Sequence, residues 1–358
     1  MSEDNLIIDA TRRILADFAD PQVAATGAPG GWKAALWPQL EAAGLTRAWL
    51  SEAQGGAGAP VSAGFDILRL SGQFAGAAPL AETLLAGWTL ARAGLELPDG
   101  PTTVGPLRPH DRLTLDAAGQ VSGALHAVPF GGGVDRLAGL ALDGAGGAHV
   151  VLLDLAAGRV VPRQIALTTE RVDIVFEAAV PSVLAPAPKD FGPADFEALG
   201  AVIRVQQMAG ALETALQLAT AYAGERVAFG RPIGKFQAVQ QNLARLGGEV
   251  AAALTAAASA ADTLACRMEG GTVTEADLLL EIAAAKIRVG EAATEGAAIA
   301  HQVHGAIGFT SEYQLQRFTR QLWSWRDDFG SESAWALRLG RATAEAGADA
   351  LWPALTRR

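Results

Sequence analysis

Long stretches of helical periodicity in the C-terminal half constrain the fold more than any other feature of this sequence. From Pro193 onward, apolar residues recur at steps of three and four, the spacing that places them on one face of an α-helix. The first such stripe consists of Leu199, Ile203, Met208, Leu212, Leu216 and Tyr222. We expect this helix to end at Gly230-Arg231-Pro232, because glycine and proline both terminate helices.

Three more helices are predicted after the first. Their expected bounds are Gln237–Met268, Thr274–Val303 and Ser331–Leu339. The Thr274 hydroxyl can cap the third helix, and Asp277, three residues later, can return a hydrogen bond to Thr274, as in a capping box. Successive long helices of this kind predict a four-helix bundle.

The rest of the chain shows two other residue patterns. In residues 5–97 apolar residues recur every three or four positions, as in helices, and a turn at Gly55–Pro60 interrupts them. From Pro101 to about Pro186 there are short β-like runs separated by glycines. Examples of these runs are Val150–Leu155 (VVLLDL) and Val172–Phe176 (VDIVF). The order predicts an α+β fold with segregated elements, not an alternating βαβ sheet. We expect an N-terminal helical domain over residues 1–100, a middle β domain over 101–190 and a C-terminal four-helix-bundle domain over 191–358.

Composition narrows the function classes. The chain has 28 Lys and Arg against 38 Asp and Glu, a net charge of −10, and its basic residues form no stripe. A nucleic-acid or anionic-membrane partner is therefore not favoured. The sequence shows no signal peptide and no run of roughly 20 strongly apolar residues, and its single cysteine indicates a reducing compartment. We expect a cytoplasmic protein in which Cys266 is a buried structural residue, and we predict no metal site.

Two sequence blocks carry a resemblance to a known family. Tyr222–Leu243 reads YAGERVAFGRPIGKFQAVQQNL, which resembles the R-x-x-F-G-x-x-I segment and the Gln-bearing helix of acyl-CoA dehydrogenases. His301–Arg320 reads HQVHGAIGFTSEYQLQRFTR, which is similar to that family's Q-x-x-G-G-x-G-[FY] loop and the helix after it, with Ala306 in place of the second paired glycine. The resemblance covers nearly the whole chain, is strongest over about the last 160 residues, and implies the family's three-domain fold with FAD as cofactor.

In the family, these blocks hold the ADP end of the FAD bound by a neighbouring subunit. The matching positions here are Arg226, Phe229, Gln237, Gln302 and Gly305, and Ser331 stands at the [TS] position of the family's Y-E-G-[TS] turn. The residue types suit this role, because guanidinium groups pair with phosphate, an aromatic face stacks on adenine, and glycine lets backbone N–H groups approach phosphates. Taken singly, each of these residues could equally be a helix cap, a core residue or a surface residue. Taken together, their order and spacing favour the FAD site.

The resemblance also implies a glutamate that removes the α-proton of an acyl-CoA thioester while the β-hydrogen leaves as hydride to the flavin. The family places this glutamate in one of two positions, which here hold Phe329 and a residue close to Gly200. Neither residue can act as a base. The nearby carboxylates that could replace it are Asp328, which is our catalytic candidate, and Asp327, Glu332 and Glu197.

Segments that contact the flavin ring in the family match poorly around Thr102–Arg108 and Ala127–Gly133, with Phe130 as the best substitute. Since the elements that reach a partner's FAD are kept while the base is lost, we hypothesise a supporting subunit of an α2β2 complex with a homologous catalytic chain. Family members of this kind degrade steroid side chains and related bulky acyl-CoAs, and the family implies an electron-transferring flavoprotein as electron acceptor. Two alternatives stay open: a homomeric enzyme with a displaced carboxylate base, and a flavin-free scaffold.

Overall fold

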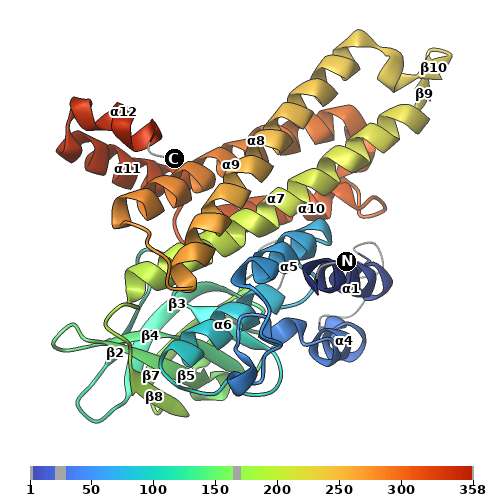
Figure 1. The fold of residues 1–358 in the computed structure, drawn as a ribbon. Helices are drawn as coiled ribbons and strands as arrows, with labels where there is room; N and C mark the ends of the chain where they lie inside the picture. The colour runs from blue at the N-terminus through green and yellow to red at the C-terminus, as the bar shows by residue number, and fades with distance from the viewer. Residues whose placement is uncertain (1–2, 21–29, 164–170, 357–358) are drawn as a thin grey trace.

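The computed structural model describes residues 3–20, 30–163 and 171–356. The N-terminal part is helical, and it consists of α1 (Glu3–Phe18), α3 (Trp32–Ala35), α4 (Trp37–Ala42), α5 (Val61–Gln73) and α6 (Leu80–Arg92), with 3₁₀ turns at Leu45–Arg47 and Glu52–Gln54. Most residues of α5 and α6 are buried. Helix α5 packs on the C-terminal helices and α6 packs on the sheet, so this part joins the other two (Figure 1).

The middle part is a single sheet that contains both predicted β runs. Its strands are β1 (Thr102–Gly105), β2 (Arg112–Leu115), β3 (Val121–Pro129), β4 (Arg136–Asp143), β5 (Ala148–Asp154), β6 (Arg159–Pro162), β7 (Arg171–Ala179) and β8 (Val183–Pro186). They lie in the order β6-β7-β3-β2-β4-β5-β8, with β1 beside β4, and the pairs β1–β4 and β2–β4 are parallel.

Alternate side chains of the sheet belong to two different cores, because successive residues of a strand point to opposite faces. On β5, Val150 and Leu152 join the core that the sheet shares with the helices. Val151 and Leu153 join a separate core made within the β part. The sheet thus contributes one face to the junction with α6 and keeps the other for its own folding.

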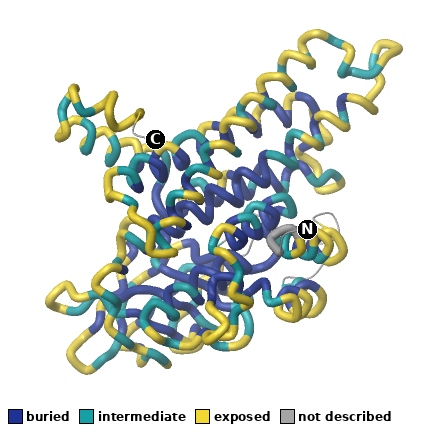
Figure 2. The backbone as a smooth tube through the Cα atoms, in the orientation of Figure 1, coloured by how far each residue is buried: buried dark blue, intermediate teal, exposed yellow. Residues whose placement is uncertain are grey.

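The C-terminal part contains α7 (Pro193–Glu225), α8 (Gln237–Met268), α9 (Glu275–His304), α10 (Leu315–Arg326), α11 (Glu332–Ala346) and α12 (Ala348–Thr356). The long helices α7, α8 and α9 lie side by side, with the short hairpin of β9 (Val227–Ala228) and β10 (Arg231–Pro232) at the tip far from the sheet (Figure 1). The predicted cap is confirmed, since Thr274 Oγ1 accepts a hydrogen bond from the Asp277 N–H at 3.1 Å. Buried segments run along the middle of this bundle (Figure 2).

Three details of the sequence interpretation need correction. Helix α7 ends at Glu225, before Gly230, because Arg226 already has extended backbone and leads into the β9–β10 hairpin. Helix α11 continues past Leu339 to Ala346 and is followed by α12, which was not predicted. Cys266 is exposed, because the buried positions in that turn of α8 are Leu264 and Ala265. Among the described residues, no helix is both long enough and apolar enough to cross a membrane.

Candidate functional site

The turn between α10 and α11 places a phenyl ring against α7. Phe329 has left-handed backbone (φ +55°), and its ring lies so close to Gly200 that a Cβ on this glycine would be 2.4 Å from it. The Phe329 N–H donates to the Leu107 carbonyl at 2.8 Å, and the Phe329 carbonyl accepts from Trp335 Nε1 at 2.9 Å. The two positions singled out for their missing glutamate are therefore in contact, and a buried aromatic ring fills the space between them.

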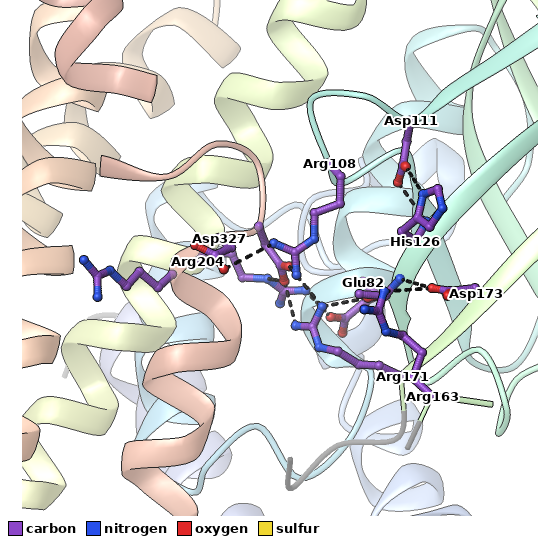
Figure 3. Close-up of polar contacts among 12 residues, drawn as sticks. Glu82, Arg108, Asp111, His126, Arg163, Arg171, Asp173, Arg204 and Asp327 are labelled. Carbon is purple, nitrogen blue, oxygen red and sulfur yellow. Dashed lines mark hydrogen bonds and ion pairs between the residues drawn. The ribbon is translucent and has the colours of Figure 1, made fainter. Parts of the chain in front are cut away.

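Asp328, the candidate base, lies fully buried in a cluster of arginines. Arg171 of β7 donates to both carboxylate oxygens, at 3.0 and 2.8 Å, and Arg204 of α7 donates from Nε at 3.0 Å. Arg108, which follows β1, lies 3.3 Å away. Figure 3 shows these three arginines converging on the turn next to Asp327. Burial alone would raise the pKa of Asp328, but the charges of Arg171, Arg204 and Arg108 outweigh it and lower the pKa to about 2.

The cluster extends to every part of the molecule. The Arg204 guanidinium also donates to Glu82 of α6 at 2.7 Å and to the Gln207 side chain at 2.6 Å. From α9, Lys286 Nζ donates to the carbonyls of Arg326 and Asp328, at 2.9 and 3.0 Å. Burial is the main reason that the pKa of Lys286 falls to about 8. Ion pairs thus hold the turn against α7 and the sheet, Arg204 links it to α6, and hydrogen bonds from Lys286 hold it against α9.

The other carboxylates near the turn are also paired with arginines. Glu197 accepts two hydrogen bonds from Arg338, at 2.8 and 2.7 Å. Glu332 pairs with Arg326. Asp327 is largely exposed and lies 3.9 Å from Arg108. Each of these three carboxylates therefore already has an arginine beside it.

A pocket is lined by residues of α6, the start of α7, the end of α8 and the start of α9. Its floor is apolar and its rim carries the ion pairs Arg92–Asp190 and Arg267–Asp195. The apolar lining residues are Trp88, Phe191, Ala198, Leu199, Leu264, Met268 and Leu278. An apolar group could be held here, and the two carboxylates that line the pocket, Asp190 and Asp195, are both paired with arginines.

The predicted cofactor residues gather at the opposite end of the bundle. Arg226 and Phe229 lie at the β9–β10 hairpin, where Phe229 is 96% exposed, and Gln237 is the first residue of α8. Gln302 and Gly305 lie at the end of α9, where they are exposed. The two groups are joined because Tyr222 of α7 stacks on His304 of α9, with 4.7 Å between ring centroids.

This end is far from the Phe329 turn. Gly200 and Arg226 are 26 positions apart on α7, which is about 39 Å along a straight α-helix. Ser331 lies at the near end, next to Phe329, where its hydroxyl accepts the Ala334 N–H at 3.4 Å and caps α11. The structure therefore groups five of the six predicted cofactor residues and places Ser331 apart from them.

Comparisons with known proteins agree with this architecture. Residues 199–326 match the model of the acyl-CoA dehydrogenase C-terminal domain. The sequence is 35% identical to acyl-CoA dehydrogenase IpdE2 of Mycobacterium tuberculosis over 121 residues, which is 34% of each chain. It is 38% identical to glutaryl-CoA dehydrogenase of Desulfococcus multivorans over 112 residues, 31% of this chain and 27% of that one. The aligned segments thus span about a third of the length of these curated relatives.

Solved structures match over almost the whole chain. A variant of the steroid acyl-CoA dehydrogenase Tcur3481–Tcur3483 has a TM-score of 0.81 and 25% identity, covering 96% of this chain and 98% of that one. The ChsE4–ChsE5 complex of Mycobacterium tuberculosis has a TM-score of 0.84 and 23% identity, covering 97% and 99%. Residues 199–326 are therefore similar in sequence to acyl-CoA dehydrogenases, and the chain as a whole has the fold of that family, with its N-terminal helices, middle sheet and C-terminal helices.

FAD is the cofactor that similarity to acyl-CoA dehydrogenases implies. Within the part of the chain that the structure describes, the side chains of Arg226, Gln237 and Gln302 form no hydrogen bond, and Phe229 exposes its ring. A guanidinium, two amides and a flat apolar face are the groups that the phosphates and adenine of a dinucleotide require. The residues at the β9–β10 end therefore fit the nucleotide half of FAD.

Sequence reasoning missed the charged cluster around Asp328. Arg171, Arg204, Glu82 and Lys286 were not singled out, although all four are buried. One signal was available: Arg204 interrupts the apolar run Ala201–Val205 in the middle of a helix, and an arginine at such a position requires a buried partner. The identity of that partner depends on the fold, because Asp328 and Glu82 are more than a hundred residues away along the chain.

Proposed function

We propose that this chain is the supporting subunit of a heteromeric, FAD-dependent acyl-CoA dehydrogenase. In this proposal it contributes the β9–β10 end of its bundle to the FAD of a homologous catalytic subunit and supplies no base of its own. The complex desaturates an acyl-CoA thioester between its α- and β-carbons. Bound FAD supplies the hydride acceptor for that reaction, and the reduced flavin is reoxidised by an electron-transferring flavoprotein.

The contact between Phe329 and Gly200 carries the proposal. A base must come within hydrogen-bonding reach of the substrate's α-carbon proton. Both positions where the family places its glutamate are occupied here, one by a ring and one by a residue without a side chain. Asp328, next to the ring, is engaged by three arginines with its pKa lowered to about 2, so we assign it a structural role.

The separation of the two ends supports a site shared between chains. Arg226 lies about 39 Å from Gly200 along the axis of α7, and Gln302 lies at the end of α9 that the Tyr222–His304 contact places beside that end of α7, so neither side chain reaches the Phe329 turn. They suit a cofactor whose reacting ring is held elsewhere. The chains named in the ChsE4–ChsE5 complex and in Tcur3481–Tcur3483 share this fold, and those names describe paired chains.

The deciding experiment is flavin stoichiometry. We expect the chain expressed alone to bind no FAD, and we expect about one FAD per pair of chains when it is co-expressed with a homologous subunit that retains the glutamate. Changing that glutamate to glutamine should abolish turnover while leaving the flavin bound. One FAD per chain in the isolated protein would contradict the proposal and favour a homomeric enzyme.

Matched variants test the role of the β9–β10 end. Arg226→Ala and Gln302→Ala should lower the flavin content of the complex without separating its chains. Arg245→Ala is the control, since Arg245 is an exposed arginine of the same bundle that forms only a surface ion pair with Glu295. If all three variants retain full flavin, this end does not bind the cofactor.

A further inference from the structure

The β9–β10 hairpin holds an aromatic residue in an unfavourable conformation at its turn. Ala228 pairs with Arg231 across the hairpin, so Phe229 and Gly230 form a two-residue turn between the strands. Both turn residues have left-handed backbone, with φ of +51° and +79°. Glycine and asparagine are the usual residues in such a turn, and a phenylalanine there is strained. Because the Phe229 ring is also 96% exposed, burial of the ring does not offset this strain within the chain.

A second aromatic ring supports the turn. Phe236 follows the 3₁₀ turn Ile233–Lys235 and meets the Phe229 ring edge-to-face, with 6.2 Å between the centroids and 85° between the planes. The Phe236 N–H donates to the Ile233 carbonyl at 3.0 Å, and the Ile233 N–H donates to the Arg226 carbonyl at 2.8 Å. These backbone hydrogen bonds fix Phe236 relative to the end of α7.

Arg231 also rests on Phe236. Its guanidinium lies over the Phe236 ring, with Cζ 4.3 Å from the ring centroid. Arg231 is exposed, and within the part of the chain that the structure describes it forms no ion pair and no side-chain hydrogen bond. A guanidinium held over an aromatic face keeps its N–H groups available, and it loses less freedom when these groups bind an anion.

The tip of the bundle is cationic although the protein is acidic. Residues 222–240 contain Arg226, Arg231 and Lys235 but only one acidic residue, Glu225, whereas the whole chain has a net charge of −10. All three cationic side chains are exposed, and none of them forms an ion pair with another described residue. Available cations beside an exposed aromatic ring suit a ligand that is both anionic and aromatic.

We propose that Arg231 is a second phosphate-binding residue of the nucleotide site, beside Arg226, and that Phe236 is a positioning residue for its guanidinium. The proposal rests on the proposed function, in which this end of the bundle holds the ADP half of FAD. That half carries two phosphates, each with a negative charge, and the single guanidinium of Arg226 matches only one of them. Arg231 supplies the second cation. Stacking of the Phe229 ring on adenine accounts for the strained and exposed conformation of that residue.

Titrating FAD into the flavin-free complex of this chain with a homologous catalytic subunit, followed by flavin fluorescence, measures the dissociation constant. We expect Arg231→Gln to raise it about 10-fold or more, as for loss of a charge-assisted hydrogen bond. Arg231→Lys should recover only part of this loss, because an ammonium lacks the planar fork of donors. Lys235→Gln is the matched control: it removes the same charge from the same tip, so it should change the dissociation constant much less than Arg231→Gln.

A double-mutant cycle tests the positioning role of Phe236. Phe236→Leu should weaken FAD binding when Arg231 is present and should have a clearly smaller effect in the Arg231→Gln background, where no guanidinium remains to be held. Effects that simply add would show that Phe236 does not act through Arg231, and the positioning role would be wrong.

Equal losses in Arg231→Gln and Lys235→Gln would overturn the proposal, because they would show only a diffuse effect of charge. An unchanged dissociation constant in Arg231→Gln would overturn it as well. Arg226→Ala separates this failure from failure of the proposed function. If Arg226→Ala weakens FAD binding and Arg231→Gln does not, only the role of Arg231 is wrong; if neither variant weakens it, this end of the bundle does not hold the nucleotide.

Discussion

Arg204 and Asp328 face each other inside the protein, with Arg204 Nε 3.0 Å from a carboxylate oxygen and both side chains buried. The same guanidinium bonds Glu82 at 2.7 Å, so one arginine of α7 neutralises carboxylates from α6 and from the α10–α11 turn. Removing charges from water is costly, and it is tolerated only while each charge keeps its partners. The cluster therefore fixes the turn that carries Phe329.

Replacing Arg204 should lower the free energy of unfolding more than any surface substitution does. Arg204→Met leaves Asp328 and Glu82 buried without one of their counterions, so we expect the free energy of unfolding to fall by about 3–5 kcal/mol. Urea denaturation followed by circular dichroism measures it. Arg245→Met removes only an exposed ion pair and should cost no more than about 1 kcal/mol. Equal losses in the two variants would contradict the assigned role of the cluster.

Asp328 should make the protein sensitive to acid. Its pKa is about 2 in the folded protein and near 3.8 when unpaired, so it stabilises the fold above pH 4 and this contribution is lost as the pH falls toward 2. The contribution at neutral pH is on the order of 2–3 kcal/mol. We expect Asp328→Asn to lower the free energy of unfolding at pH 7 and to differ less from the wild type as the pH drops below 4. A constant difference at all pH values would argue against the lowered pKa.

Lys286 should make the stability of the protein depend on pH in the alkaline range. Its pKa falls from 10.5 to about 8 on folding, because burial disfavours the charged ammonium. The charged form is thus bound less well by the folded state, so stability rises as the pH increases from 8 toward 10.5, by about 3 kcal/mol. Lys286→Met should lack this rise. Unfolding curves for both proteins between pH 7 and 10 test it, and parallel pH profiles would show that Lys286 titrates normally.

The sequence predicted the helices and the sheet well because each element carries its own local signal. Gln237–Met268 was predicted with the bounds that α8 has, and Gly270-Gly271 marks its C-terminal end. The end of α7 was misplaced because the extended backbone at Arg226 depends on the pairing of β9 with β10. These strands have only two residues each, which is too short to give a recognisable sequence pattern. Helix α12 was not predicted; it is short and contains Pro353, a residue that argues against a helix.

The candidate site was predictable only in part, for a physical reason. The absence of glutamate at Phe329 and near Gly200 could be read from single positions. That these two residues touch could not, since they are 129 positions apart and their contact depends on the packing of α7 against the α10–α11 turn. The arginines around Asp328 come from β7, α7 and the loop after β1, so they form a cluster only in three dimensions.

The contact between Phe329 and Gly200 predicts strongly coupled mutations. A Cβ at position 200 would lie 2.4 Å from the ring, so Gly200→Ala should cost about 1–3 kcal/mol through overpacking. In a Phe329→Ala background the same change meets no ring, and alanine favours the helix over glycine by about 1 kcal/mol, so Gly200→Ala should become neutral or stabilising there. A double-mutant cycle of urea unfolding measures the coupling. Gly340→Ala is the control, because nothing lies within 4 Å of a Cβ at that helical glycine and its effect should be the same in both backgrounds. If the effects of the Gly200 and Phe329 changes simply add, the ring does not fill the space above α7, and the main argument for a chain without its own base is lost.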